Sequence, residues 1–236
     1  FVDMQLSQIR PGYVRALKTY LSVLESRNAL LRQDKLQGVS DFANQLDAWD
    51  EQLANAAVPI VRSRRWFLQE LSENSSREYA QISENPDEPF SLFYVGPLAQ
   101  SDAPYEQMLA GLRRNREEDR RRMYTTFGPH RDDVSLQLFG RDLRAMGSQG
   151  QLRTAVLSMK LGEIRLIEKE MGESPTLLLD DVFSELDAKR RNALFKSAAP
   201  LQTFITCTDR QDAAGARADC FLRVTPTPDG TVLSRE

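Results

Sequence analysis

The stretch SPTLLLDDVFSELD, residues 174–187, constrains the fold more than any other part of this 236-residue chain. Its continuous apolar run is typical of a strand buried on both faces of a parallel sheet. Two adjacent carboxylates, Asp180 and Asp181, follow where such a strand ends. There, the first aspartate can hold Mg²⁺ through water, and the second can orient a water that attacks a γ-phosphate. The stretch therefore predicts the acidic half of a nucleoside triphosphatase site, or else an ordinary turn after a strand.

The usual partner of such an acidic strand is a glycine-rich phosphate loop of the form G-x-x-x-x-G-K-S/T. The 236 residues contain no Gly-Lys pair, so this loop is absent from the chain. Positioning of the substrate supplies much of the rate in phosphoryl transfer. We therefore expect that the chain by itself does not turn over ATP.

Three further stretches favour the nucleotide interpretation by their order along the chain. Upstream, GSQGQLR at 147–153 places Ser148 and Gly150 at a helix start, where free N–H groups attract phosphate, although serine there is often only an N-cap. SELD at 184–187 follows the two acids, and the apolar run QTFITCTD at 202–209 ends in polar residues. Together these features predict a nucleotide-binding sheet.

Apolar periodicity divides the chain into two parts of different character. Residues 1–126 are predicted to be mainly helical, with two long antiparallel helices: one over Pro11–Arg32 and one from Ser40 past Leu71. Pro59 lies inside the second helix, so we expect a kink or a break there. Residues 127–236 alternate strands with helices, which predicts an α/β fold: the C-terminal part of a nucleotide-binding sheet.

The pattern also predicts a series of shorter elements. They are a loop at 84–89, strands at 90–95 and 134–139, a returning strand at 143–146, helices at 104–122, 149–171 and 188–197, strands at 176–183 and 202–208, and a final strand pair after residue 219. Gly172 is the expected C-cap of the helix at 149–171.

Charge excludes a strongly basic nucleic-acid module. The net charge is −3, with 16 basic and 18 acidic residues up to Thr126 and 15 and 16 after it. The densest basic cluster is Arg113, Arg114, Arg116, Arg120, Arg121 and Arg122, interrupted by Glu117, Glu118 and Asp119. It is either a solvated helix face or a DNA-contacting surface. In the second case, replacing Arg120 to Arg122 should flatten the salt dependence of binding.

Other residue types narrow the classes of protein further. No apolar run approaches the ~18 residues of a membrane span, and the N-terminus lacks the layout of a signal peptide, so a cytoplasmic protein without a membrane partner is expected. Cys207 and Cys220 lie in apolar surroundings and are predicted to be buried thiols rather than a disulfide or metal pair. His130 is the only histidine and cannot build a histidine-rich metal site.

In these motifs the chain resembles the RecF family, bacterial recombination-repair proteins built like the ATPase heads of the SMC and ABC families. SQGQ is similar to the signature motif, LLLDD to the Walker B strand and SELD to the D-loop, and Thr208 occupies the switch position. GPHRDD at 128–133 and the tyrosine–leucine run over Tyr13–Arg32 are similar to stretches typical of the family. The resemblance covers essentially the whole chain and lacks the family's N-terminal segment, with Walker A and the Q-loop.

The resemblance implies site residues, with ATP and Mg²⁺ as cofactors of the intact protein. It implies that Asp181 is the catalytic residue and that Asp180 binds magnesium. The implied signature residues, which act on the ATP of a partner subunit, are Ser148, Gln149, Gly150 and Gln151. Ser184 and Asp187 are the implied D-loop residues, and Thr208 is the implied switch residue.

Three functions are compatible with this resemblance. The first is an ATP-dependent DNA clamp of recombinational repair and replication restart, which dimerises on ATP around single-stranded DNA or a single/double-strand junction. The second is a scaffold that recruits mediators of the RecO and RecR type, with DNA contact secondary. The third, a transporter-type ATPase subunit, is disfavoured because GPHRDD is present and no membrane-partner motif is found.

The HRD sequence at 130–132 also matches part of a kinase catalytic loop, H-R-D-x-x-x-x-N. Gln137 stands where that loop requires asparagine, and no glycine-rich loop precedes it, which excludes a kinase. His130, Arg131, Asp132 and Asp133 either order a loop beside a ligand or form a salt-bridged turn, and the sequence leaves this open.

Overall fold

The computed structural model describes residues 1–83, 87–180, 182, 186–209, 218–227 and 230–235. These form two compact units, Phe1–Ser174 and Pro175–Glu236, which are treated separately below. The sequence predicts a division at residue 126, between a mainly helical part and a part that alternates strands with helices. That division stays a prediction. Among the described residues, every helix is too short or too polar to cross a lipid bilayer.

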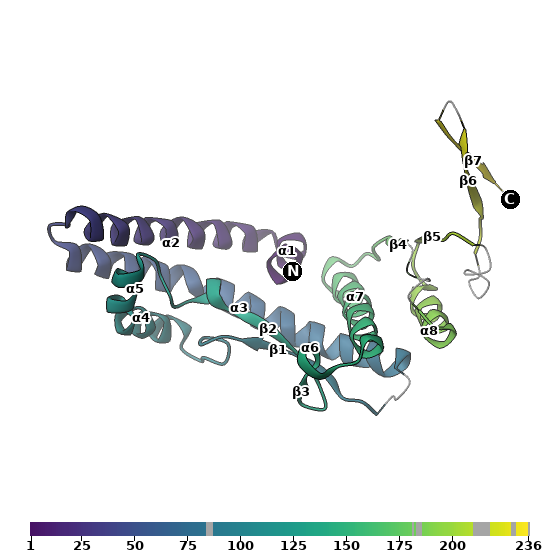
Figure 1. The fold of residues 1–236 in the computed structure, drawn as a ribbon, viewed down its shortest axis with the longest axis horizontal. Helices are drawn as coiled ribbons and strands as arrows, with labels where there is room; N and C mark the ends of the chain where they lie inside the picture. The colour runs from purple at the N-terminus through teal and green to yellow at the C-terminus, as the bar shows by residue number, and fades with distance from the viewer. Residues whose placement is uncertain (84–86, 181, 183–185, 210–217, 228–229, 236) are drawn as a thin grey trace. The chain divides into compact units, whose positions relative to one another are not determined.

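Unit 1 is organised around a long helical hairpin. After the short helix α1 (Val2–Ile9), which the sequence pattern missed, α2 (Pro11–Gln37) and α3 (Phe42–Ile82) run antiparallel to each other (Figure 1). Pro11 begins α2, where its missing N–H costs nothing, and Gly38 ends it at φ 72°. The two predicted long helices are confirmed.

The sequence predicts a kink or a break at Pro59, and helix α3 continues through this residue without a break. Pro59 itself is exposed, whereas Ala56, Ala57 and Ile60 beside it are buried in the core. Packing of these apolar neighbours outweighs the loss of one backbone hydrogen bond. The result is a single 41-residue helix that serves as the spine of the unit.

Helix α7 (Gln149–Met171) packs against the C-terminal half of α3 and ends at Gly172 as predicted, with φ 72°. Gly162 permits a close approach, because a Cβ at this position would lie 2.8 Å from the backbone nitrogen of Ser75. Lys169 also pairs with Glu70 across the contact, at 2.7 Å. A glycine in the middle of α7 is thus explained by helix packing.

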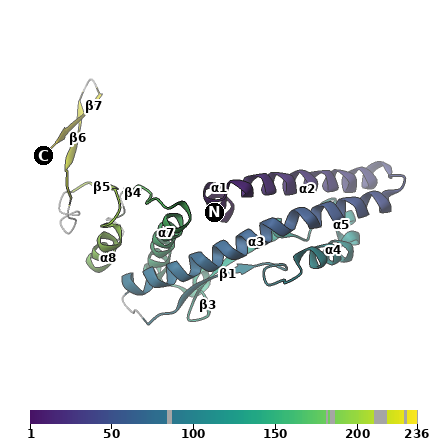
Figure 2. The same cartoon turned by 180° about the vertical axis from the view of Figure 1, so that it is seen from behind.

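An antiparallel sheet covers another side of α3: β1 (Phe90–Val95), β2 (Asp133–Leu138) and β3 (Arg141–Asp142). β1 runs along α3 (Figure 2) and buries Phe90, Leu92 and Tyr94. As an edge strand, it has unpaired backbone groups. Ser72 of α3 accepts from the Leu92 N–H at 2.9 Å, and the Ser76 hydroxyl donates to the Phe90 carbonyl. The helix therefore satisfies part of the open edge.

Two sequence predictions in unit 1 are wrong. The expected helix at 104–122 is two helices, α4 (Pro104–Arg114) and α5 (Arg116–Arg122), with a 3₁₀ turn η1 (Pro129–Arg131) after them. They separate at Asn115, whose side-chain amide donates to the Gly111 carbonyl at 2.8 Å. The expected strand LRAM is a helical turn, α6 (Leu143–Met146), because the Asp142 side chain caps it by accepting from the Ala145 N–H.

Unit 2 contains a parallel strand pair, a helix and a hairpin. β4 (Leu177–Asp180) lies parallel to β5 (Thr203–Thr206) and the chain between them forms α8 (Ala188–Ala198). β6 (Leu222–Thr227) and β7 (Gly230–Arg235) pair antiparallel. All five elements were expected from the sequence.

The cysteine prediction is wrong in its burial. Cys207 and Cys220 are free thiols, as expected, but both are exposed. Cys207 directly follows the end of β5 and Cys220 precedes β6, so neither lies inside a strand. Apolar neighbours in the sequence therefore did not indicate whether the cysteine itself is buried.

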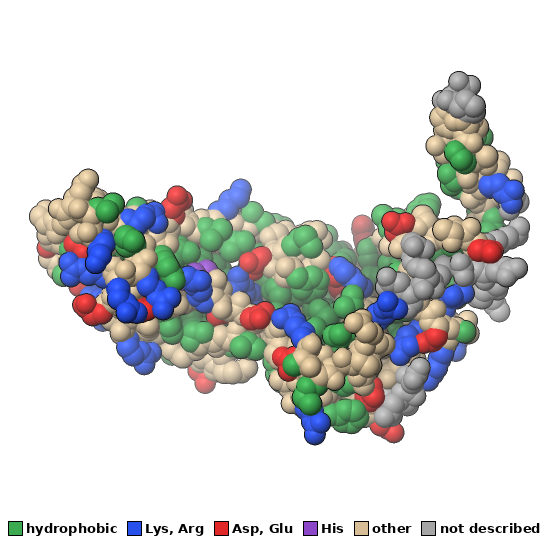
Figure 3. All heavy atoms as spheres, in the orientation of Figure 1, with side chains coloured by type: hydrophobic (Ala, Val, Ile, Leu, Met, Phe, Trp, Pro, Cys, Tyr) green, Lys and Arg blue, Asp and Glu red, His purple; other side chains and the backbone are tan. Residues whose placement is uncertain are grey.

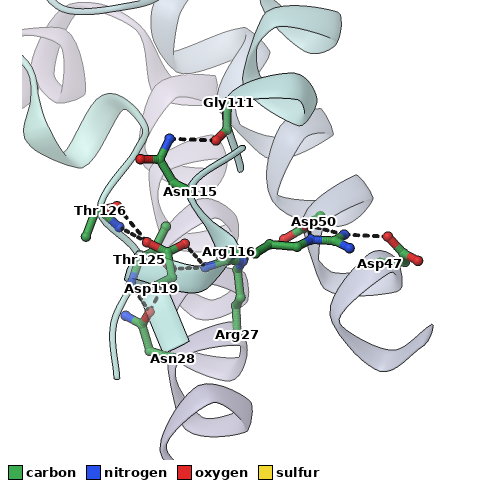
Figure 4. Close-up of polar contacts among 10 residues, drawn as sticks. All are labelled: Arg27, Asn28, Asp47, Asp50, Gly111, Asn115, Arg116, Asp119, Thr125 and Thr126. Atoms are coloured by element: carbon green, nitrogen blue, oxygen red, sulfur yellow. Dashed lines mark hydrogen bonds and ion pairs between the residues drawn. The ribbon is translucent and has the colours of Figure 1, made fainter. Parts of the chain in front are cut away.

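A buried ionic cluster joins α2, α3 and α5 (Figure 4). The side chain of Arg27 is 0% exposed and donates to Asp50 at 2.7 Å and to Asp119 at 2.8 Å. It also donates to the Thr125 hydroxyl at 2.8 Å. Arg116 makes a second ion pair with Asp50, at 2.6 Å. A buried guanidinium must be compensated in this way, so the cluster fixes where the three helices meet.

We predict that Arg27→Met lowers the free energy of unfolding by about 3–5 kcal/mol, because it leaves buried carboxylates without their partner. The measurement is urea denaturation near neutral pH. Arg32→Met, an exposed position on the same helix, is the matched control and should change stability by less than about 0.5 kcal/mol. Equal losses in the two variants would contradict the prediction.

Candidate functional site

The carboxyl ends of β4 and β5 bring two polar side chains together. Asp180 ends β4 and Thr206 ends β5, and the two residues are register partners. The Thr206 hydroxyl donates to the Asp180 carboxylate at 2.5 Å. Carboxyl ends of parallel strands are the usual place for ligand-binding groups in α/β sheets. This edge is therefore a candidate ligand site.

The oxygen donors at this edge fit a magnesium ion. Mg²⁺ is typically bound by one or two carboxylates and keeps several waters, and Asp180 is exposed at the strand end. Within the described ranges, no three His, Cys, Asp or Glu side chains form a metal-binding group. Asp181, the predicted catalytic acid, lies outside the described residues.

The predicted D-loop and switch residues lie in the same unit. Ser184 is outside the described residues. Asp187 is the N-cap of α8: its carboxylate accepts from the Arg190 N–H at 2.9 Å, and this bond lowers the pKa of Asp187. Thr208 is exposed, two residues beyond the end of β5. Their catalytic roles stay predictions.

The predicted signature residues form the first turn of α7, in unit 1. Ser148 is the N-cap, and it exchanges two hydrogen bonds with Gln151 in a capping box, at 3.0 and 3.2 Å. Helix geometry leaves the N–H groups of Gln149 and Gly150 without partners inside the helix. The turn can therefore offer two N–H donors and the positive end of the helix dipole to an anion.

The segment GPHRDD places His130 and Asp132 on the inside of unit 1. The Nε2 of His130 lies 3.0 Å from the Thr125 carbonyl, which can only accept, so Nε2 carries the proton and Nδ1 accepts from the Tyr20 hydroxyl at 2.5 Å. Tyr94 donates its hydroxyl to Asp132. Burial lowers the pKa of His130 and raises that of Asp132. These two residues thus form part of the internal packing of the loop.

The other two residues of this segment face outward. The Arg131 guanidinium lies 5.0 Å from the ring centre of Tyr124, and Asp133 pairs with Arg144 at 3.7 Å. Inward-facing and outward-facing residues thus alternate along 130–133, and only the outward-facing ones are exposed to a ligand. It supports the structural turn for His130 and Asp132 and leaves Arg131 as a candidate binding residue.

The six clustered arginines do not form a uniform cationic surface. Figure 3 shows basic side chains gathered over α4 and α5, but acidic side chains are interspersed. Arg116 pairs with Asp47 and Asp50, Arg120 with Asp34, and Arg121 and Arg122 with Glu118. Among the described residues, Arg113 and Arg114 form no ion pair. The predicted DNA-binding role stays a prediction, with these two the least compensated.

Sequence reasoning missed two sets of residues. Thr206 was not predicted, because the register that pairs it with Asp180 is set by strand packing and is not visible in the sequence. The partners of Arg27 are 23 and 92 residues away, and no local pattern signals them.

Comparison with known proteins gives a consistent result. The chain is 42% identical over 214 residues to the "DNA replication and repair protein RecF" of Herpetosiphon aurantiacus, and 36% identical over 232 residues to that of Lachnoclostridium phytofermentans. These matches cover 90% and 98% of this chain, but the chain spans only 55% and 62% of the relatives' own length. No model of a protein family matches.

Solved structures agree with the sequence matches. Two structures described as the recombination mediator protein RecF in the RecFOR pathway, one with ATP and one with ATPrS, have a TM-score of 0.84 and 32% identity. They are matched over 99–100% of this chain and 61% of theirs. The predicted fold class, the C-terminal part of an ATPase head plus a largely helical lobe with two long antiparallel helices, is confirmed.

We predict that the stability of the protein falls as the pH drops below about 6.5. His130 is held neutral, so its pKa is lower folded than unfolded, and the unfolded chain binds the proton first. The contribution is lost from the unfolded pKa of about 6.5 downward, at no more than about 1.4 kcal/mol per pH unit. The measurement is urea denaturation between about pH 5.5 and 7.5.

His130→Gln is the control variant, since the chain has no other histidine. Its stability should lack this slope, while the contributions of carboxylates such as Asp132 remain in both proteins. The same pH slope in the variant would show that another group is responsible.

Proposed function

This chain is a RecF-family sequence over the region that these relatives match, and we propose that it forms part of an ATP-dependent DNA-binding protein of recombinational repair. The proposal rests on one observation above all: Asp180 and Thr206 lie together at the carboxyl ends of two parallel strands. It is supported by the RecF names of the relatives and by the ATP in one matched structure.

At the ATP site, Asp180 would hold Mg²⁺ and Asp181 would orient the attacking water. Magnesium would neutralise charge that develops on the phosphates. Thr206 orients the Asp180 carboxylate through its hydroxyl. Asp187 would act through the start of α8, which it caps, and Thr208 would contact the nucleotide from the loop after β5. The phosphate loop would come from a segment of the longer protein.

The first turn of α7 would act on the nucleotide of a second subunit. The N–H groups of Gln149 and Gly150 would face the phosphates, while Ser148 and Gln151 keep the turn rigid through the capping box. ATP would then join two copies into a dimer that holds DNA, and hydrolysis would release it.

A second candidate function is a scaffold for mediators of the RecO and RecR type. It is favoured by apolar side chains exposed on α2, Leu21 and Leu36, the latter 77% exposed near the hairpin turn. Salt-dependent DNA binding by the intact protein would favour the first function over this one.

The test of the dimeric arrangement uses two variants in a full-length protein that carries this sequence. Ser148→Arg should damage only the partner's site, and Asp181→Asn only its own. A mixed dimer then has one site with both defects and one with neither. Mixing equal amounts should therefore recover up to about a quarter of wild-type ATPase activity, if dimers assort freely.

Because Ser148 also caps α7, Ser148→Ala serves as the control for the lost cap, which costs about 1 kcal/mol. It should lower stability without placing a cation at the turn. If mixed dimers form, one intact site suffices for activity and mixing still restores nothing, the arrangement across subunits is wrong.

The test of DNA contact compares two pairs of exposed cations in the same full-length protein with ATP. Arg113→Ala with Arg114→Ala should reduce the slope of log affinity against log salt by about 1–2, since each lost phosphate contact removes about 0.9. Arg15→Ala with Lys18→Ala, on the exposed face of α2, is the control of equal charge change. Equal slopes in both variants would assign DNA contact elsewhere.

A further inference from the structure

A polar hollow opens beside α5 in unit 1. It has a volume of about 310 Å³. Its lining consists of Asn115, Glu118, Arg122, Tyr124, Thr126 and Arg131. Two of these six side chains are guanidiniums, and only one is acidic.

Tyr124 holds both guanidiniums in place. Arg122 donates to its hydroxyl at 3.1 Å, and Arg131 lies over its ring at 5.0 Å. The hydrogen bond from Arg122 lowers the pKa of Tyr124, and Arg131 adds to this effect. Two guanidiniums therefore converge on one tyrosine side chain in the lining of the hollow.

The floor of the hollow is rigid. The backbone N–H and the hydroxyl of Thr126 both donate to Asp119, at 2.8 and 2.6 Å, and Asp119 is fixed in turn by the buried Arg27 (Figure 4). Asn115 is tied to the Gly111 carbonyl. A ligand would thus meet groups that are already in position, which reduces the entropy cost of binding.

The charges in the hollow favour an oxyanion. Glu118 divides its ion pairs between Arg122 and Arg121, so it compensates Arg122 only in part, and the lining carries a net charge of +1. Arg131 has no carboxylate partner among the described residues. A phosphate has oxygens enough to accept from both guanidiniums at once.

We infer that this hollow binds a phosphate group, with Arg131 and Arg122 as its two ligating side chains and Tyr124 as the residue that positions them. The phosphate is either free or part of a nucleic acid strand. In the second case the hollow adds a DNA contact to the proposed function, but the inference for the phosphate group itself does not depend on that function.

The test is calorimetric titration of the chain with inorganic phosphate at low ionic strength. Arg131→Ala should weaken binding about tenfold, as expected for the loss of a hydrogen bond to a charged group, and Arg122→Ala should weaken it similarly. Arg15→Ala, an exposed arginine on α2, removes the same charge elsewhere and should leave the affinity within about twofold. Urea denaturation should confirm that all variants remain folded.

Tyr124→Phe keeps the ring under Arg131 and removes the hydroxyl that holds Arg122. It should weaken phosphate binding less than either arginine variant. Absence of phosphate binding by the wild-type chain, or equal binding by Arg131→Ala and Arg15→Ala, would overturn the inference.

Short single-stranded oligonucleotides with and without a 5′-phosphate identify the source of the group. Arg131-dependent binding of only the phosphorylated strand indicates a terminal phosphate, and equal Arg131 dependence for both indicates a backbone phosphodiester. No Arg131 dependence for either, with phosphate binding retained, indicates a free anion. Failure of the ATPase or salt-slope tests would leave the phosphate titration unaffected, so the two proposals can fail separately.

Discussion

The buried guanidinium of Arg27 is the interaction on which the rest of unit 1 depends. A charge that is 0% exposed is stable only with carboxylates at hydrogen-bond distance, and Asp50 and Asp119 must therefore come from α3 and α5 to meet it. Both carboxylates also position other residues, because Asp50 pairs with Arg116 and Asp119 accepts a hydrogen bond from Thr126. One buried charge thereby sets the position of three helices and of the segment that leads to GPHRDD.

This constraint explains how much of the fold could be predicted. Local signals succeeded: helix periodicity gave α2 and α3, and the serine and glycine at the ends of α7 gave its limits. Two predictions failed, one because of a short-range cap and one because of distant partners. LRAM was taken for a strand because its apolar pattern was visible, whereas the short-range cap from Asp142 that decides its conformation is a small energy easily overlooked. The split at Asn115 likewise falls next to Arg116, whose partners lie on α3.

The candidate site shows the same division. Asp180 could be predicted because a continuous apolar run ends there, and the parallel pairing of β4 with β5 agrees. Thr206 could not be singled out, because register between strands depends on packing rather than on sequence spacing. The apolar pattern of β4 also exceeds the burial that one neighbouring strand provides: Leu178 is 72% exposed and Phe204 of β5 is 55% exposed. This pattern is that of a larger sheet, in keeping with relatives that are longer than this chain.

The arginines show why charge in a sequence is a poor guide to a binding surface. In the buried ionic cluster and along α5, the guanidiniums of Arg27, Arg116, Arg120, Arg121 and Arg122 are paired with five carboxylates, namely Asp34, Asp47, Asp50, Glu118 and Asp119. Their fields largely cancel beyond a Debye length, so an approaching anion is guided by the cations that remain. Among the described residues of α4, α5 and the GPHRDD segment, these are Arg113, Arg114 and Arg131, of which Arg131 lies outside the sequence cluster. An arginine is therefore free to bind an anion only where the fold does not pair it with a carboxylate. Arg27 contributes to this pattern, because it fixes the positions of Asp50 and Asp119.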